Sequence, residues 1–287
     1  MRRASGWTQR AGGAGRRRPA SAALAALAGA ALLTAGPEPA GGQTPDARGS
    51  VPVPERVRSP LAPVPFGPGE QAEYEVTLGP FSVGGAIMQV VTVEPVRSRP
   101  SYHISWRIEA GIPLARVDDH FESWVDVETL ATLRSLKKVR EVGYSADRHY
   151  EIYPEAGYWD RLDTGESEKM ITALPLDDVS FVYYARSLPL EVGETYTLDR
   201  YFIADRNPVI LEVLRKETIE VPAGTFETIV VRPIIKARGL FGEGGEAEIY
   251  LTDDDRRLLV RLSSRVPVLG SLSLHLRSAR EGVPIRR

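Results

Sequence analysis

The stretch Glu70-Gln-Ala-Glu-Tyr-Glu-Val-Thr-Leu78 alternates polar and apolar residues with a period of two. Successive side chains of a β-strand point to opposite faces of its sheet, so Ala72, Tyr74, Val76 and Leu78 share one apolar face while the residues between them face water. This pattern predicts a strand of an antiparallel sheet. The same alternation recurs over residues 102–109, 246–251 and 271–276.

Further strand-like runs occupy most of the remaining chain, and turn signals rich in glycine, proline and asparagine separate them. A spacing of about 8 to 12 residues per strand and turn is typical of sandwiches and barrels. We therefore predict an all-β, mainly antiparallel fold, built as a curved sheet or an open or closed β-barrel. The runs are 83–93, 117–127, 132–142, 144–153, 194–203, 209–215, 225–236 and 257–263.

One segment, Leu176–Leu188, breaks the alternation and predicts a covering α-helix of about three turns. Asp177 can accept a hydrogen bond from a free amide at a helix start, and apolar residues follow with helical spacing at positions 179, 182 and 183. Pro189 then ends the helix. A single helix in an otherwise all-β chain plugs the mouth of a barrel or covers one face of a curved sheet.

The first 68 residues differ in composition from the rest. Residues 1–42 contain arginines, then an apolar run from Ala22 to Leu33, then the small residues Ala40-Gly41-Gly42, which is the order of a secretory signal peptide. The apolar run is too short to anchor the chain in a bilayer. Seven prolines within residues 43–68 predict an extended, disordered tether. We expect one antiparallel β domain over 69–280, a tail over 281–287, and a periplasmic or secreted location.

Composition excludes several classes of partner and site. Loss of the leader near Gly42 removes six arginines and one glutamate, which leaves 30 basic and 37 acidic residues and a net charge of about −7. Such a surface does not favour a nucleic-acid partner. The absence of cysteine excludes disulfides, thiolate metal sites and a lipidated cysteine at the cleavage point. No second apolar run is long enough to cross a membrane, so we expect a soluble mature protein of unassigned oligomeric state.

Several short motifs follow one another between Pro65 and Arg277. They are Phe66-Gly-Pro-Gly-Glu70, Tyr74-Glu-Val76, Val83-Gly-Gly-Ala86, Asp178-Val-Ser180, Tyr183-Tyr-Ala-Arg186, Val221-Pro-Ala-Gly-Thr-Phe226, Ile249-Tyr-Leu-Thr-Asp-Asp-Asp-Arg256 and Gly270-Ser-Leu272. In this order they resemble the bacterial envelope family called domain of unknown function 3108. The resemblance implies an exported, mostly antiparallel β protein of the open-barrel kind seen in lipoprotein and lipid carriers. It implies no established activity and no catalytic residues.

Two interpretations apply to the densest polar cluster, which includes Asp118, His120 and Glu122. These three side chains share one face of a strand, where an imidazole and two carboxylates would suit a divalent cation and a metal-dependent hydrolase. The favoured alternative is a solvent-facing row, because no histidine pair has the spacing of metal ligands. No catalytic motif occurs elsewhere, and we predict no cofactor and no metal. We predict that Asp253-Asp254-Asp255 forms a hairpin turn.

Aromatic residues are concentrated in the middle third of the chain, around the predicted helix. Core packing explains such a cluster by default, because aromatic side chains bury large areas. The sharper hypothesis is that the curved sheet and the helix enclose an apolar cavity for a hydrophobic ligand, which would be a lipid, an acyl chain, a hydrophobic peptide or a lipoprotein. The protein would then be a non-enzymatic carrier gated by its helix, with a purely structural envelope protein as a further alternative. The predicted ligand-binding residues are Trp106, Tyr153, Trp159, Phe181, Val182 and Tyr184.

Overall fold

The computed structural model describes residues 63–112, 115–235, 247–266 and 270–285. Within these residues, fourteen strands form one antiparallel sheet. Their bounds are β1 (Gln71–Leu78), β2 (Phe81–Val96), β3 (Arg99–Ile112), β4 (Ala115–Asp126), β5 (Thr132–Glu141), β6 (Tyr144–Tyr153), β7 (Tyr158–Arg161), β8 (Glu166–Lys169), β9 (Thr195–Leu198), β10 (Val209–Val221), β11 (Gly224–Ile234), β12 (Glu248–Thr252), β13 (Leu259–Val266) and β14 (Gly270–Arg280).

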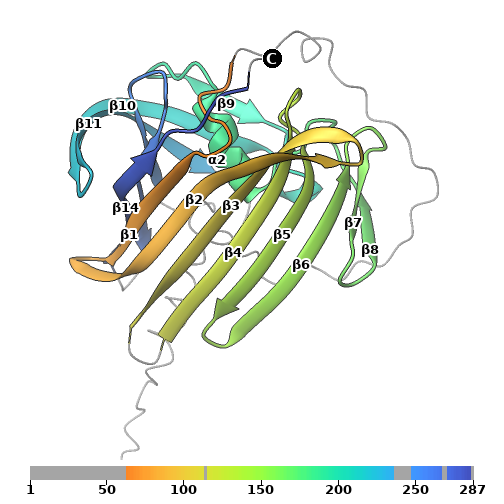
Figure 1. The fold of residues 1–287 in the computed structure, drawn as a ribbon, viewed down its shortest axis with the longest axis horizontal. Helices are drawn as coiled ribbons and strands as arrows, with labels where there is room; N and C mark the ends of the chain where they lie inside the picture. Colours follow the sequence, from red (N-terminus) through yellow and green to blue (C-terminus); the bar gives the residue numbers. More distant parts are fainter. Residues whose placement is uncertain (1–62, 113–114, 236–246, 267–269, 286–287) are drawn as a thin grey trace, which may run out of the picture.

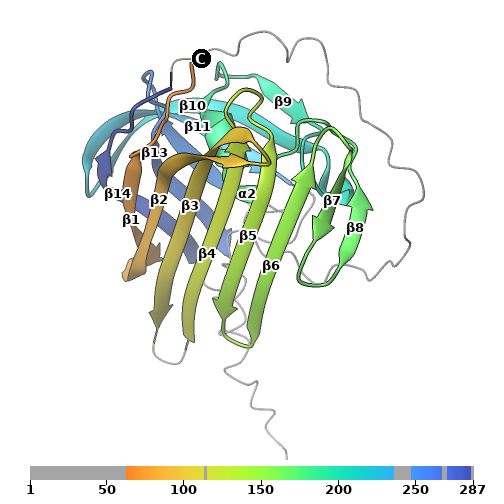
Figure 2. The ribbon, with the colours of Figure 1, turned by 45° about the vertical axis from the view of Figure 1, so that its right-hand side comes forward.

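The sheet is a meander whose first and last strands meet in its middle. Its order is β8-β7-β6-β5-β4-β3-β2-β1-β14-β13-β12-β11-β10-β9, so β1 pairs with both β2 and β14. The sheet curls strongly, and the β10 and β11 side lies behind the β3 to β6 side (Figures 1 and 2). Among the described strands, β8 and β9 end the sheet and do not pair with each other. The predicted antiparallel, barrel-like architecture is therefore confirmed, in its open form.

A non-strand segment spans the gap between the two ends of the sheet. Leu176 forms a parallel bridge with Tyr201, with hydrogen bonds from Leu176 N to the carbonyl of Arg200 and from Phe202 N to the carbonyl of Leu176. The Phe202 ring then packs edge-on against Tyr150 at 5.0 Å. Backbone hydrogen bonds of Leu176 and the aromatic ring of Phe202 thus connect the two ends of the sheet.

The alternation in the sequence matches the two faces of the sheet. Ala72, Tyr74 and Val76 of β1 are buried, and Leu272 and Leu274 of β14 pack into the same core. In β12 the turn predicted at Asp253-Asp254-Asp255 follows the last strand residue, Thr252. Burial of one side of each strand supplies the main stabilisation, at roughly 25 cal/mol per Å² of apolar surface.

The β2–β3 hairpin covers part of the outer face of the sheet. Val96 forms a second, smaller apolar cluster with Trp124 and Leu133, separate from the main core. Arg97 donates to the carbonyl of Leu133 at 2.9 Å and pairs with Glu151. This hairpin therefore explains why the outer face near β4 and β5 carries buried apolar residues.

Some boundaries differ from the prediction. Val64 and Phe66, within the stretch predicted as a tether, are buried in the main core. At the other end, Val283 N donates to the carbonyl of Pro68 at 3.0 Å, so the expected tail lies along the start of the domain. Strands β7 and β8 were not predicted, and β9 is shorter than its predicted run. The predicted signal peptide lies outside the described residues.

Candidate functional site

The interior of the curved sheet contains α2 (Asp178–Arg186), the helix predicted from the sequence. Asp177 is its N-cap: Ser180 N donates to Asp177 Oδ1 at 2.8 Å, and Asp177 N donates to the Ser180 hydroxyl at 2.8 Å. This reciprocal capping box satisfies free donors at the helix start. All residues of α2 except Tyr184 are buried. The helix is therefore enclosed on nearly all sides, whereas a helix covering one face would leave its other side in water.

A buried polar cluster holds the N-terminal end of α2. Asp178 pairs with Lys137 of β5 and accepts a hydrogen bond from the hydroxyl of Tyr201, and both partners are buried. Arg206 donates to the Tyr201 hydroxyl at 2.9 Å. Burial raises the pKa of Tyr201 well above its usual value, which keeps this phenol protonated as a donor. The helix start is thus tied to β5 and to the segment between β9 and β10.

A buried ion pair holds the C-terminal end of α2. Arg186 Nη1 and Nη2 lie 2.6 and 2.9 Å from the two carboxylate oxygens of Glu70, and Nη2 also donates to the carbonyl of Arg256 at 3.1 Å. The guanidinium lies 5.5 Å from the centre of the Phe66 ring and 5.1 Å from that of Tyr183. Three motifs that are far apart in the sequence therefore meet around Arg186.

The predicted ligand-binding residues fall into two groups. Trp106, Trp159, Phe181 and Val182 are buried in the main apolar cluster, and Tyr184 packs against it. A side chain with no accessible surface contacts neither solvent nor an internal space that holds water, so these residues are in direct contact with their neighbours. Tyr153 lies apart from them: it stacks on Tyr158 at 4.7 Å, with the guanidinium of Arg97 4.5 Å from its ring centre.

Three buried donors on aromatic side chains of this interior have no hydrogen-bond acceptor within the described part of the chain. They are the indole Nε1 of Trp106, the indole Nε1 of Trp159 and the hydroxyl of Tyr102. A buried donor without an acceptor costs about 1–3 kcal/mol, so native proteins contain few of them. Tyr102 and Trp106 belong to the same inner row of β3, which faces the core together with Ile104 and Ile108.

The alternative metal-binding residues lie on the outer face of β4. Asp118 lies 3.6 Å from Arg107, His120 Nε2 lies 3.0 Å from the Ser105 hydroxyl, and Glu122 lies 2.9 Å from His103 Nε2. The hydrogen bond from His103 holds the pKa of Glu122 below its usual value. Each of the three side chains thus contacts a different partner. Within the described ranges, no group of three or more His, Asp or Glu side chains is arranged to hold a metal ion.

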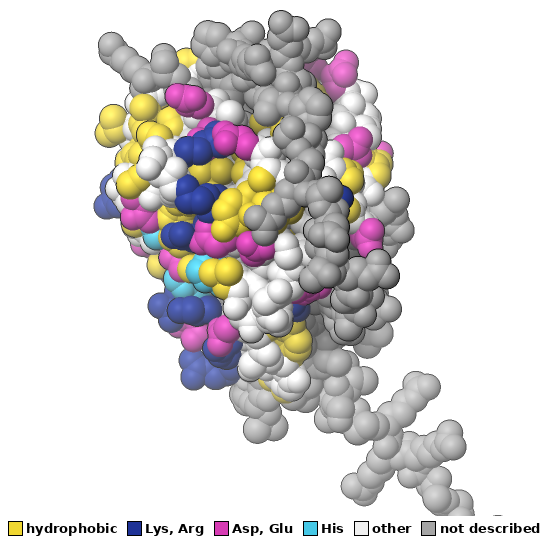
Figure 3. Space-filling model, turned by 90° about the vertical axis from the view of Figure 1, so that its right-hand side faces the viewer, with side chains coloured by type: hydrophobic (Ala, Val, Ile, Leu, Met, Phe, Trp, Pro, Cys, Tyr) yellow, Lys and Arg dark blue, Asp and Glu magenta, His cyan; other side chains and the backbone are white. Residues whose placement is uncertain are grey.

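The same face carries mixed charges along its length. Figure 3 shows histidine side chains among acidic and basic ones, with basic side chains gathered toward the lower end of the face that it displays. Histidine therefore takes part in a polar network on the outside of the sheet. His149 adds to it from β6, with its Nε2 3.1 Å from a carboxylate oxygen of Glu151.

A buried pair of carboxyl groups, Asp119 and Glu141, faces the interior from β4 and β5. Asp119 Oδ1 accepts a hydrogen bond from the backbone of Arg140 at 2.9 Å. Burial raises the pKa of Asp119 to about 6, and burial together with the neighbouring charge of Asp119 raises the pKa of Glu141 to about 8. Near neutral pH the pair therefore holds a proton, principally on Glu141.

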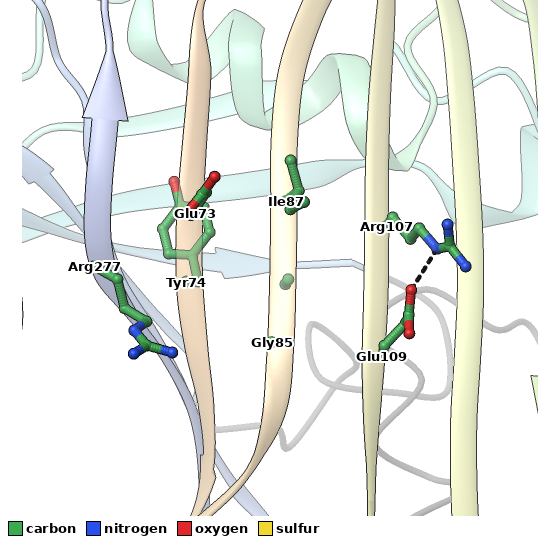
Figure 4. Close-up of a pocket in the computed structure, with 8 residues that line it drawn as sticks. Glu73, Tyr74, Gly85, Ile87, Arg107, Glu109 and Arg277 are labelled. Carbon is green, nitrogen blue, oxygen red and sulfur yellow. Dashed lines mark ion pairs between the residues drawn. The ribbon is translucent and has the colours of Figure 1, made fainter.

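A shallow hollow of about 450 Å³ lies on the outer face of the sheet over β14, β1, β2 and β3. Figure 4 shows it from outside, with α2 behind the sheet. The hollow exists because Gly85 presents no side chain there, while Ile87 borders it. Its charged lining is mixed: Arg107 is 2.9 Å from Glu109, and the remaining charged residues are Glu73 and Arg277.

The sequence matches a protein family described as "Protein of unknown function (DUF3108)" over residues 73–277. The chain belongs to this family. The resemblance inferred from the motif order is thereby confirmed, and the family description assigns no activity. A comparison with curated proteins gave no match.

Three solved structures are similar to the chain at low sequence identity. A beta-barrel-like protein of domain of unknown function DUF1849 from Brucella abortus is 9% identical, with a TM-score of 0.48, and the match covers 77% of this chain and 100% of that one. A protein described as exported, with a YmcC-like fold, from Bacteroides fragilis is 13% identical, with a TM-score of 0.27 and coverage of 76% and 99%. A protein described as a lipoprotein from Parabacteroides distasonis is 10% identical, with a TM-score of 0.30 and coverage of 76% and 99%.

Sequence reasoning missed the buried charged residues of the interior. Lys137, Glu141 and Asp119 all lie on strands whose alternation was recognised, and each occupies an inward position in that alternation. A charged residue in register with an apolar row was the signal that could have located them.

No helix in the part of the chain that the structure describes is long and apolar enough to cross a membrane.

Proposed function

We propose that this protein is an exported, non-enzymatic envelope protein that binds a hydrophobic molecule, such as an acyl chain, on the concave face of its sheet. The observation that carries the proposal is the position of α2. A nine-residue helix lies in the interior of an open sheet and is in contact with β3 and β4. A ligand that displaced this helix would meet the inward apolar residues of β3 and β4, with Ser123, Thr132 and Lys137 at the end where the helix starts.

The site would consist of the inner row of β3, the inner face of β7 and the helix itself. Trp106, Trp159, Phe181 and Val182 supply apolar contact area for an acyl chain. The unpartnered indole donors of the two tryptophans favour a ligand that also carries an acceptor, such as an ester or a carboxylate. Tyr184, the one half-exposed residue of α2, would lie at the entrance, where the Arg200 guanidinium is 4.1 Å from its ring centre.

Export is part of the proposal because residues 1–42 have the order of a signal peptide. A periplasmic or secreted location follows if the leader is removed. N-terminal sequencing of the protein recovered from the periplasm or the medium tests this step, and an intact Met1 would contradict it.

The binding step is tested by lipid extraction of the purified protein with mass spectrometry, and by titration with a fluorescent fatty acid. We expect a co-purifying lipid or saturable binding. The absence of both would refute the proposal and would favour a structural protein with a filled core.

The place of binding is tested by locking the helix. The Thr132 and Ser180 hydroxyls lie 2.8 Å apart, on β5 and α2, and the native chain has no cysteine. A Thr132→Cys/Ser180→Cys variant can therefore form a single disulfide. We expect the oxidised form to lose fatty-acid binding and the reduced form, the matched control, to keep it. Equal binding by both forms would place the ligand away from α2.

A further inference from the structure

The segment that follows β9 carries a half-buried arginine, Arg200, next to the point where the two ends of the sheet meet. Leu176 N donates to the carbonyl of Arg200 at 2.6 Å, beside the bridge between Leu176 and Tyr201. The guanidinium donates from Nε to the carbonyl of Leu174 at 2.7 Å and from Nη2 to the carbonyl of Leu130 at 3.4 Å. Two separate backbone segments therefore hold the guanidinium in place.

The positive charge of Arg200 has no counter-charge among the described residues. Both of its hydrogen bonds go to neutral carbonyls, and no carboxylate in the described part of the chain forms an ion pair with it. Asp199, its neighbour in sequence, is exposed. Arg186 at the end of α2 differs in this respect, because it pairs with Glu70.

The two arginines also differ in the direction of their pKa shifts. Burial lowers the pKa of Arg200. Burial acts in the same direction at Arg186, but the charge of Glu70 and its hydrogen bond outweigh it and raise the pKa of that guanidinium. A buried cation that lacks a counter-charge is costly, so the surroundings of Arg200 favour the arrival of an anion.

Arg200 lies where α2 is accessible from outside. Its guanidinium is 4.1 Å from the ring centre of Tyr184, the one residue of α2 that is not buried. Two positions further along the chain, the Phe202 ring packs edge-on against the buried Trp159 at 6.0 Å. Arg200 therefore lies between the exposed part of the helix and the aromatic interior. Displacement of α2 would also remove Tyr184 and free one face of the guanidinium.

We propose that Arg200 binds the carboxylate of the hydrophobic ligand, so that the interior accepts a long-chain carboxylic acid with its head group at Tyr184 and its chain directed inward. This inference rests on the proposed function and names the ligand class of the same site. The guanidinium fork matches the two oxygens of a carboxylate. Its single charge suits a monoanion better than the dianion of a phosphate monoester. Apolar pockets with a few polar groups that fix the orientation of the ligand are typical of small-molecule sites.

The test is a series of ligands with the same chain and different head groups: dodecanoate, dodecanol, dodecylamine and dodecyl phosphate. Each competes with a fluorescent fatty acid for the full chain, at concentrations below micelle formation. We expect dodecanoate to bind most tightly and dodecylamine most weakly. Equal affinity for dodecanoate and dodecanol would overturn the inference and leave the proposed function in place, whereas binding of none of the four would overturn both. Tighter binding of dodecyl phosphate than of dodecanoate would overturn the assignment of a carboxylate.

Arg200→Gln should weaken dodecanoate binding by about 10- to 100-fold, the range for loss of a hydrogen bond to a charged group, and should leave dodecanol binding unchanged. Arg200→Lys retains the charge without the fork and should keep part of the preference for dodecanoate. Arg277→Gln is the matched control, because Arg277 is an exposed arginine at the hollow on the outer face. It should bind all four ligands like the unchanged chain.

A purely structural role of Arg200 predicts a different outcome. Arg200→Gln would then weaken the binding of dodecanoate and dodecanol equally, and that result would overturn the inference. An unchanged preference for dodecanoate in Arg200→Gln would also overturn it, since another group would then bind the head group. Melting curves show whether each variant is folded, and the ligand series on the unchanged chain tests the inference without any variant.

Discussion

Replacement of Arg186 by methionine tests whether the meeting point of three sequence motifs is a structural element. The side chain is 3% exposed, makes two hydrogen bonds to Glu70 and donates to the carbonyl of Arg256. Methionine retains much of the apolar stem but leaves the carboxylate of Glu70, whose side chain is 8% exposed, without its cation. A buried charge that has lost its partner destabilises a fold far more than removal of both charges does.

The expected cost is about 3–5 kcal/mol, the range for removal of one partner of a buried ion pair. For a domain of this size, 1 kcal/mol shifts the melting temperature by about 2–4 °C, so Arg186→Met should melt about 6–20 °C lower. The double variant Glu70→Leu/Arg186→Met removes both charges and should recover part of this loss. Together with the single variant Glu70→Leu, these two variants form a double-mutant cycle whose coupling energy isolates the contribution of the pair.

The assay is urea denaturation followed by circular dichroism, with thermal melting as a second measure. Arg107→Met is the control, because Arg107 and its partner Glu109 are each about half exposed, with side-chain values of 52% and 53%. Such a pair contributes about 1 kcal/mol or less. If Arg186→Met behaves like this control, or if the double variant loses as much as the two single variants together, the reasoning fails.

Three further outcomes follow from other parts of the fold. Folding raises the pKa of Asp119 to about 6 and that of Glu141 to about 8, so the folded state binds more protons than the unfolded state between about pH 4 and 8. The free energy of unfolding should therefore fall as pH rises through this window. An Asp119→Asn/Glu141→Gln variant should show a smaller fall when urea titrations are repeated at several pH values. A Cβ at Gly84 would lie 2.1 Å from a backbone oxygen of β3, whereas a Cβ at Gly85 would lie 3.4 Å from its nearest atom. Thermal melting should therefore show that Gly84→Ala lowers the free energy of unfolding by about 1–3 kcal/mol and that Gly85→Ala lowers it much less. Asp177→Ala removes the helix cap and should cost about 1–2 kcal/mol, and an unchanged unfolding free energy would show that the cap is dispensable.

The strands could be predicted from the sequence because alternation is a local signal. Each recognised run, such as 102–109, reports its own faces without reference to distant residues. Strands β7 and β8 have four residues each, and Glu166-Ser-Glu-Lys169 contains no apolar row, so no alternation marks them. These strands form because β7 pairs with the free edge of β6 and β8 then pairs with β7. The position of that edge is known only once the sheet has folded.

The site was predicted less completely, because its polar parts join residues far apart in the chain. Glu70 and Arg186 were both recognised within family motifs, yet their pairing across 116 positions follows from the sheet order and the place of α2 inside it. Lys137 lies in the predicted strand 132–142 and its partner Asp178 lies in the predicted helix, but neither pattern indicates that the two side chains pair. Local sequence patterns identify the strand and the helix, but they do not indicate that the two lie next to each other in the folded protein.

The two buried charge clusters also bear on how α2 could leave the interior. Apolar contacts alone would allow the helix several similar positions, whereas Lys137 with Asp178 at one end and Glu70 with Arg186 at the other define one register. When such pairs open, water solvates the separated charges and offsets much of the lost attraction, while exposed apolar surface gains no such compensation. If the proposed ligand displaces α2, the displacement would be favourable only when the apolar ligand covers the surface that the helix vacates, and the movement of the helix would then depend on cargo.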